Sequence, residues 1–448
     1  MRTIIALATW AVLAPWPVAA QDPPRAQDQP ETQTSRGPLE PRPIVIQHIR
    51  PVDQRGIGVF EAPKAPGAPF TGFRLDFNAA FTQQFQDLTH RNQAAPNVVG
   101  GVDRNQLMPI GAGFNNATAN LYLNAQLARG IRVALTTYLS SRHHPEAWVK
   151  DGYLQLDASP IDIELLHRLM RYVTVRVGHF EINYGDAHFR RSDNGNAIYN
   201  PFVGNYILDA FTTEIGAEVY VRASGLLAMG AVTGGEIRGT VLSPDARAPA
   251  FIGKLGFDRQ LRPDVRVRLT GSLYTTDRSA NNTLYGGDRA GSRYYFVMEN
   301  SQATEAAQAW SGLINPGFRS AVTAVQVNPF VKYRGLEFFG VLERAEGRAA
   351  NEPADRRWTQ YAADVVYRAL PREQLYAGVR YNRAEGRLAG LPGDVGAERW
   401  QLAAGWFITP GILAKVEYVR QDYFGFPVTD IRSGGRFDGL MLEGVVAF

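Results

Sequence analysis

The sequence predicts an all-β chain that closes into a transmembrane antiparallel β-barrel of about sixteen strands, with short periplasmic turns and long external loops. Three observations predict this fold. Apolar and polar residues alternate in segments between residues 70 and 448. Short and long connections alternate between these segments, and aromatic residues gather at the segment ends. A period of two is typical of a strand between two environments. An even strand number with unequal connections is the plan of a membrane barrel.

Residues 1–20 are interpreted as a secretory signal peptide. Arg2 supplies the positive start, residues 4–12 are apolar, and Val18-Ala19-Ala20 offers the small residues that favour cleavage before Gln21. This apolar stretch is too short to span a membrane as a helix.

Residues 21–69 are rich in proline, glutamine and charge, with few apolar residues close together. Such a composition cannot bury enough surface to fold alone, so we expect a flexible periplasmic arm. The short extended piece Pro43–Ile46 is the part of the arm that could dock on the barrel.

The barrel itself is predicted to occupy residues 70–448. Phe73, Leu75 and Phe77 alternate with Arg74 and Asp76, and later segments repeat this pattern. We predict sixteen strands that begin near residues 71, 117, 131, 149, 172, 212, 226, 250, 265, 321, 336, 357, 373, 397, 411 and 437. Two places weaken this count, because the link 160–171 is long for a turn and residues 294–298 could form a further strand.

The ends of the predicted strands and of the chain favour a membrane barrel over a soluble sandwich. Rings such as Trp400, Trp406 and Tyr418 suit the interfacial girdles of a barrel. The last segment alternates up to Phe448, which we interpret as a signal for the barrel assembly machinery. Closure satisfies every backbone polar group in hydrocarbon, and sixteen strands are enough to leave an aqueous channel.

Composition excludes several other classes of protein. The 448 residues contain no cysteine, which removes disulfides, thiolate metal sites and cysteine nucleophiles, and the net charge of +4 argues against nucleic acid as a partner. His143-His144-Pro145-Glu146 is interpreted as a solvated loop, because adjacent imidazoles on an extended chain point apart. No hydrolase or metalloprotease motif is present. We therefore expect no catalytic residues, no metal and no cofactor.

The segment Val175–Asp186, with Arg176-Val177-Gly178-His179-Phe180 running into Gly185-Asp186, resembles the family of phosphate-selective porins O and P. The stretches 190–202 and 212–218 continue the similarity, which is strongest over about fifty residues. The resemblance implies a sixteen-stranded barrel, a homotrimer, and a third loop folded inward as a constriction. Phosphate selectivity in that family rests on a ladder of arginines that cannot be aligned here.

The residues predicted to face the pore follow from the alternation. The constriction loop 185–211 contributes Arg190, Arg191, Asp186, Asp193 and Asp209. The basic residues predicted to line the pore are Arg74, Arg132, Arg176, Arg222, Lys254, Arg266, Arg268, Lys332, Arg334, Arg368, Arg380, Arg399 and Lys415. Nine acidic residues share their face, so the excess favours anions mildly, although pairing across strands would cancel many of the charges.

These features predict an outer-membrane porin that passes small hydrophilic solutes with a mild preference for anions, phosphate being one candidate. Both chain termini would be periplasmic, and the partners would be outer-membrane lipid, the assembly machinery and the solutes. One alternative is a barrel enzyme that depends on His179 or His188. A second is an adhesive or structural barrel whose loop 278–320 binds a partner. A soluble periplasmic sandwich is a third.

Overall fold

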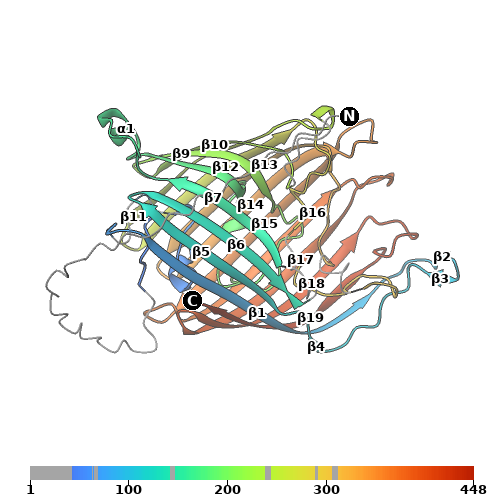
Figure 1. Ribbon diagram of the computed structural model, residues 1–448. Coiled ribbons are helices and arrows are strands. Elements are labelled where there is room, and N and C mark those ends of the chain that lie inside the picture. The colour runs from blue at the N-terminus through green and yellow to red at the C-terminus, as the bar shows by residue number, and fades with distance from the viewer. Residues whose placement is uncertain are drawn as a thin grey trace, which may run out of the picture. The chain divides into compact units, whose positions relative to one another are not determined.

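The computed structural model describes residues 43–62, 64, 69–141, 147–237, 244–287, 291–304 and 311–448. Within these ranges, sixteen long antiparallel strands form one closed sheet (Figure 1). They are β1 (Arg74–Arg91), β5 (Thr118–Ala128), β6 (Ile131–Ser140), β7 (Ala147–Leu156), β8 (Val173–Glu181), β9 (Thr213–Ala223), β10 (Leu226–Thr233), β11 (Ala250–Arg262), β12 (Val265–Thr276), β13 (Ala321–Tyr333), β14 (Leu336–Arg348), β15 (Arg356–Ala369), β16 (Leu375–Gly386), β17 (Val395–Thr409), β18 (Ile412–Phe424) and β19 (Arg436–Ala447).

The barrel closes because β1 pairs with β5 on one edge and with β19 on the other. Every other long strand pairs with its neighbours in sequence, so the sheet has no free edge for a sandwich to cover. All sixteen predicted strands are present, and each begins within three residues of its predicted start. The smaller elements are β2 (Val98–Val99), β3 (Val102–Asp103), β4 (Gly113–Phe114), α1 (Glu164–Leu169) and 3-10 turns at Gln54–Gly56, Ala187–Phe189 and Pro244–Ala246.

The two uncertain places are now resolved. Residues 160–171 contain the helix α1, so this connection is not a simple turn. Residues 294–298 form no strand, because Phe296 and Met298 have positive φ angles that a strand does not adopt. Residues 1–20, which we interpret as a signal peptide, and the histidine pair at 143–144 lie outside the described residues.

With the exception of 157–172, the short connections lie at one end of the barrel and the longer ones at the other, as the sequence predicts. One end carries the connections 129–130, 157–172, 224–225, 263–264, 334–335, 370–374 and 410–411. The other end carries 92–117, 141–146, 182–212, 234–249, 277–320, 349–355, 387–394 and 425–435. In Figure 1 the short-turn end, with α1, is on the left, and the long-loop end, with β2 and β3, is on the right.

The outer face of the barrel is apolar and the inner face is polar. In β18, Val416 is 40 % exposed, whereas its neighbours Lys415 and Glu417 are buried. The predicted girdle residues Trp400, Trp406 and Tyr418 all lie exposed on the outer face. This reversal of the soluble pattern is what a hydrocarbon environment requires. Among the described residues, no helix has the length and apolar character to cross a membrane.

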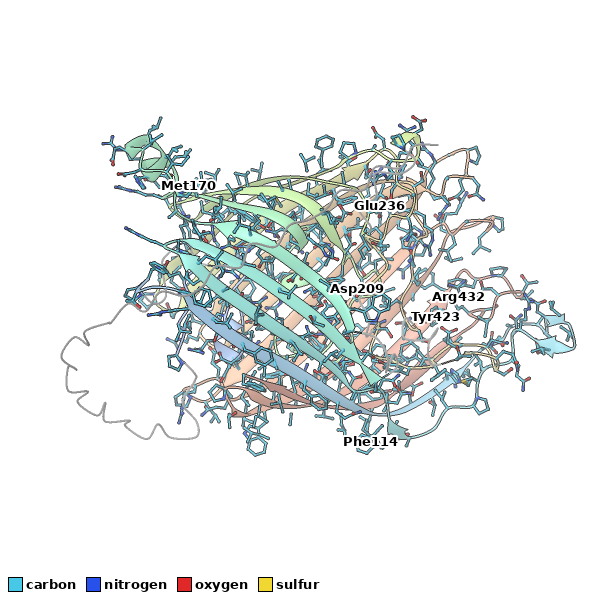
Figure 2. The ribbon with its side chains drawn as sticks, viewed as in Figure 1. Phe114, Met170, Asp209, Glu236, Tyr423 and Arg432 are labelled. Carbon is cyan, nitrogen blue, oxygen red and sulfur yellow. The ribbon has the colours of Figure 1, made fainter. Side chains whose placement is uncertain are left out.

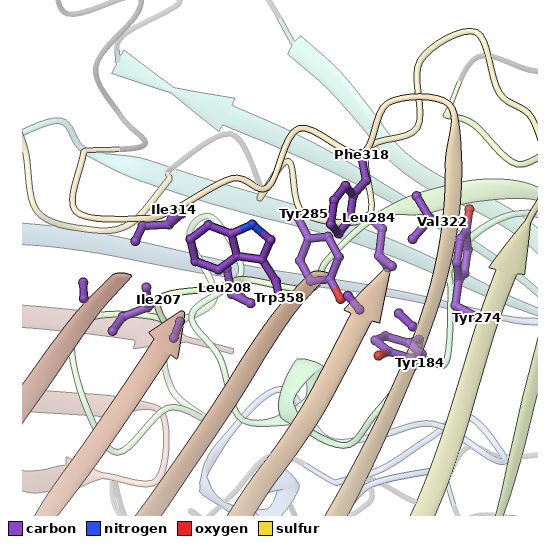
Figure 3. Packing of buried hydrophobic residues seen from close by; sticks show 14 of the residues in the cluster. Tyr184, Ile207, Leu208, Tyr274, Leu284, Tyr285, Ile314, Phe318, Val322 and Trp358 are labelled. Carbon is purple, nitrogen blue, oxygen red and sulfur yellow. The ribbon is translucent and has the colours of Figure 1, made fainter. Parts of the chain in front are cut away.

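Three segments pack inside the barrel. We call residues 43–62 with 64 the strap, residues 182–212 the inner loop, and residues 277–320 the outer loop, of which 277–287, 291–304 and 311–320 are described. Ile207 and Leu208 of the inner loop pack with Tyr285 and Ile314 of the outer loop against Trp358 of β15 (Figure 3).

The position of the strap corrects the expectation of a flexible arm for the part of residues 21–69 that is described. Ile46 and Phe60 are buried, and the strap contacts the inner wall along its length. Composition misled the prediction because the strap is held by polar side chains of the barrel and does not need an apolar core of its own.

Candidate channel and its lining

The inner loop is held in place by inward-facing side chains of the strands. The backbone N–H of Val203 donates to Glu417 of β18 at 2.7 Å, and that of Ile207 donates to Asn382 of β16 at 2.7 Å. Lys415 donates to three loop carbonyls, at 2.8 to 3.1 Å. A loop inside a barrel has no strand to pair with, so these side chains satisfy its backbone.

The inner loop lies directly against the wall formed by β1 and β5. At Gly195 a Cβ atom would stand 2.4 Å from Cα of Ala119 and 2.7 Å from the carbonyl oxygen of Ala80. Both are backbone atoms that cannot give way, so only glycine permits this approach. Thr82 of β1 donates its hydroxyl to the Gly195 carbonyl.

The five predicted constriction residues all lie inside the barrel, and each is paired. Arg191 donates to Asp209 at 2.8 Å, and Figure 2 marks Asp209 between the barrel walls. Arg190 donates to Glu337 of β14 at 2.6 Å and lies over the ring of Phe339. These two arginines are therefore fixed parts of the loop.

The remaining two constriction residues are also neutralised locally. Asp186 accepts from Lys254 at 2.6 Å and from Arg268 at 2.8 Å. Burial acts to raise the pKa of Asp186, but these two cations outweigh it and lower that pKa. Asp193 pairs with Lys150 and accepts from Tyr138. The role of these residues in selectivity stays a prediction.

The basic residues predicted to line the pore separate into groups. Five line cavities: Arg132, Arg176, Arg222, Arg266 and Arg268. Five donate to the strap, the inner loop or the outer loop: Arg74, Lys254, Arg380, Arg399 and Lys415. Lys332 and Arg368 pair with Glu373 and Glu337. Arg334 is a correction: it lies in the β13–β14 turn with a φ of 52°, so the strand alternation does not apply to it.

Three cavities follow one side of the barrel interior. An outer cavity of about 860 Å³ opens among the long loops, an inner cavity of about 220 Å³ lies between the strap, the inner loop and strands β5 to β9, and a mouth cavity of about 410 Å³ lies at the short-turn end. Lys150 lines both the outer and the inner cavity. Phe60 and Glu61 of the strap line both the inner and the mouth cavity.

The inner cavity carries a small basic excess. Its lining contains five basic residues, Arg50, Arg132, Lys150, Arg176 and Arg191, and four acidic residues, Glu61, Asp151, Glu181 and Asp193. Tyrosine rings and asparagine amides complete the wall. Such a lining suits small hydrophilic solutes and favours negative ones slightly.

Lys150 is a charged wall residue of the inner cavity that sequence reasoning missed. Between β6 and β7 the pairing shifts from Thr136–Asp151 to Thr137–Val149, which leaves Lys150 as the extra residue of a β-bulge. Lys150 and Asp151 are consequently both buried inside the barrel. Strict alternation assigns neighbouring residues to opposite faces, so a bulge defeats it.

A polar row crosses the barrel wall at the inner cavity. Arg132, Gln155 and Arg176 are directly opposite one another on β6, β7 and β8, and Glu218 follows on β9. The Gln155 side-chain oxygen accepts from Arg132 at 3.0 Å and from Arg176 at 2.8 Å. The amide thus holds two guanidinium groups at one level of the wall.

The two histidines named for the enzyme alternative are structurally engaged. His188 lies between Glu181, at 2.7 Å, and Asn183, at 3.0 Å, and burial lowers the pKa of His188. His179 bonds the hydroxyl of Thr213 at 2.8 Å. Among the described residues, no group of three or more histidine, cysteine or acidic side chains has an arrangement that could hold a metal ion.

Glu61 ties the strap to the wall, and this contact has a defined pH dependence. Burial acts to raise the pKa of Glu61, but Lys254 at 3.3 Å and Arg268 at 2.8 Å outweigh it and hold that pKa well below its usual range. Asn183 donates to the same carboxylate, and Asp186 faces it across the two cations. A carboxylate with a depressed folded pKa stabilises the fold above its unfolded pKa, and this contribution is lost as the pH falls through the folded pKa.

We therefore expect strap attachment to be constant between neutral pH and roughly pH 5 and to weaken only below about pH 4, where an unperturbed glutamate is protonated. Hydrogen exchange of residues 43–62, corrected for the intrinsic effect of pH, measures this. Loosening above pH 5 would contradict the assignment of Glu61.

The C-terminal residue completes the last strand pair. Phe448 and Ala79 exchange two backbone hydrogen bonds of 3.0 Å, and the Phe448 side chain lies exposed. Its role as an assembly signal stays a prediction.

Comparison with known proteins supports the fold alone. No family model and no curated protein matches this sequence. Among solved structures, an anion-selective porin from Comamonas acidovorans aligns with a TM-score of 0.50 at 11 % identity, over 84 % of this chain and 100 % of that one. A loop-L8 deletion mutant of OmpT, an outer membrane protein of Vibrio cholerae, aligns with a TM-score of 0.50 at 9 % identity, over 84 % of this chain and 100 % of that one. The chain thus has the fold of outer-membrane porin barrels.

Proposed function

We propose that this protein is an outer-membrane porin that passes small hydrophilic solutes by diffusion, with a mild preference for anions. The observation that carries the proposal is the series of three cavities that share lining residues from the long loops to the short turns. The solute path therefore runs off-centre, along strands β5 to β9 in the outer and inner cavities and past β9 to β12 in the mouth cavity. Sorting depends on size and charge, and no bond is made or broken.

The orientation follows from the same proposal. The apolar outer face supports a location in the outer membrane, and we propose that the short turns and both termini lie at its periplasmic face. The homotrimer implied by the resemblance stays a prediction, and cross-linking in native membranes tests it. Phosphate stays one candidate among the anions.

The described parts of the outer loop do not favour the adhesin alternative. Tyr285 donates to Glu343 at 2.8 Å and Tyr294 donates to Glu417 at 2.6 Å, and both are buried inside the barrel. A loop that presents a binding surface would keep its large side chains outside.

Single-channel recording in a potassium chloride gradient tests the proposal. We expect discrete steps whose reversal potential shows a weak preference for chloride, because basic groups exceed acidic ones by one in the inner cavity. Lys150→Gln should remove that preference, since the basic and acidic groups are then equal. Arg344→Gln is the matched control, because Arg344 is exposed and lines none of the three cavities.

Absence of steps from folded, heat-modifiable protein, with residues 43–64 either present or deleted, would overturn the channel function. If the Lys150→Gln variant showed steps with the same reversal potential as the unsubstituted protein, the channel function would stand, but the off-centre path past Lys150 would be contradicted.

A further inference from the structure

The strap makes a circuit of the short-turn end of the barrel. At its start, the backbone N–H of Gln47 donates to Gln126 of β5 at 2.8 Å. In its middle, the N–H of Gln54 donates to the Pro410 carbonyl in the β17–β18 turn at 2.9 Å. At its end, Lys64 donates to the Val173 carbonyl of β8 at 2.7 Å. The strap therefore reaches walls on both sides of the barrel opening.

Four further contacts join wall arginines to backbone carbonyls of the strap. The carbonyl of Val45 accepts from Arg74 at 2.6 Å, and that of Gly58 accepts from Arg266 at 2.8 Å. The carbonyls of His48 and Ala62 accept in the same way, from Arg132 and Arg222. Water can replace a carbonyl on an arginine at little cost, so these contacts are reversible.

Part of the strap is held by exposed groups and part by buried ones. The side chain of Arg266 is 27 % exposed and that of Lys64 is 19 % exposed. Lys254 and Arg268, which pair with Glu61, are buried, as are the inner-loop anchors Arg380 and Lys415. None of the described strap residues pairs with a barrel strand in the sheet. The strap can therefore leave its seat without any strand pair being broken.

Phe60 and Glu61 form the part of the strap that divides the path. They line the inner and the mouth cavity alike. The Phe60 ring packs on Phe330 of β13 at 5.3 Å between centroids, and Glu61 pairs with Lys254 and Arg268. One aromatic ring and one ion-paired carboxylate thus form the barrier between the two cavities.

We propose that the strap is the gate of the channel. Seated, it separates the inner cavity from the mouth cavity. When it moves off the wall toward the short-turn end, the two cavities join. The inner loop, with its buried anchors, stays in place throughout. This inference rests on the proposed channel function, and it assigns the control of flux to Phe60 and Glu61 instead of Arg190 and Arg191.

Reversible cross-linking tests the gate in the full chain, which contains no native cysteine. Cysteines at Gln47 and Gln126, joined by a short bifunctional thiol reagent that reductant cleaves, fix the strap to β5. The expected result is loss of the open steps on cross-linking and their return on reduction. The matched control pair is Thr275→Cys with Thr323→Cys, which are opposite each other on β12 and β13 and whose hydroxyls are 2.9 Å apart. Cross-linking this pair should leave the steps unchanged.

A point variant gives an independent readout. Glu61→Gln removes a charged partner of Lys254 and Arg268, and the ratio of open to closed time should rise about tenfold, the factor that losing one charge-assisted hydrogen bond gives. Glu164→Gln, in α1 at the same end of the barrel, removes an exposed carboxylate that pairs only with Arg168 among the described residues, and it should change nothing.

The outcomes separate the gate from the channel. Steps that persist unchanged in the cross-linked protein, together with an unchanged open time for Glu61→Gln, would overturn the gate and leave the channel intact. No steps from any variant, including deletion of residues 43–64, would overturn the channel and the gate with it.

Discussion

Replacement of Arg380 by methionine is expected to lower the free energy of unfolding by about 3–5 kcal/mol, the cost of leaving one buried charge without its partner. Arg380 donates to both carboxylate oxygens of Asp364, at 2.7 and 2.8 Å, and both residues are fully buried. It also donates to the Gly204 carbonyl of the inner loop at 3.1 Å and lies between the rings of Phe202 and Tyr206. The substitution therefore leaves the buried Asp364 carboxylate without its cation and removes one of the contacts that hold the inner loop.

Urea titration of the refolded barrel, followed by the gel shift between folded and heat-denatured protein, measures this loss. The double variant Arg380→Met with Asp364→Leu should recover much of it, because no unpaired charge is then buried. Arg344→Met, which breaks an exposed pair with Glu346, should cost little. Equal losses for the Arg380 and Arg344 variants would show that Asp364 and Arg380 do not form a buried pair.

The strands were predictable because two independent signals agree on them. Alternation identifies the segments, and connections such as 129–130 and 224–225 fix where each one begins. The inner face of the barrel is polar, and twelve of the thirteen basic residues, all except Arg334, lie inside the barrel as the alternation predicts; their role in the pore stays a prediction.

The interior was not predictable to the same depth. Alternation says that Arg380 and Lys415 point inward, but it cannot say whether they meet water or a loop, and here they meet the inner loop. The bulge at Lys150 depends on how two strands register, which no single strand pattern reports. The strap contacts residues more than 300 positions away, such as Arg372, and composition carries no trace of such pairings.

The most direct test of the central claim, that solutes pass beside β6 through the inner cavity, is block of current at a cysteine placed there. Ala134 lines this cavity and carries no polar side-chain group to lose. In the Ala134→Cys variant, a small charged thiol reagent should reduce the current and reductant should restore it. In Ala384→Cys, on the far wall at β16 and in none of the three cavities, the reagent should leave the current unchanged. Block at Ala384→Cys with none at Ala134→Cys would place the path elsewhere in the barrel and contradict the account.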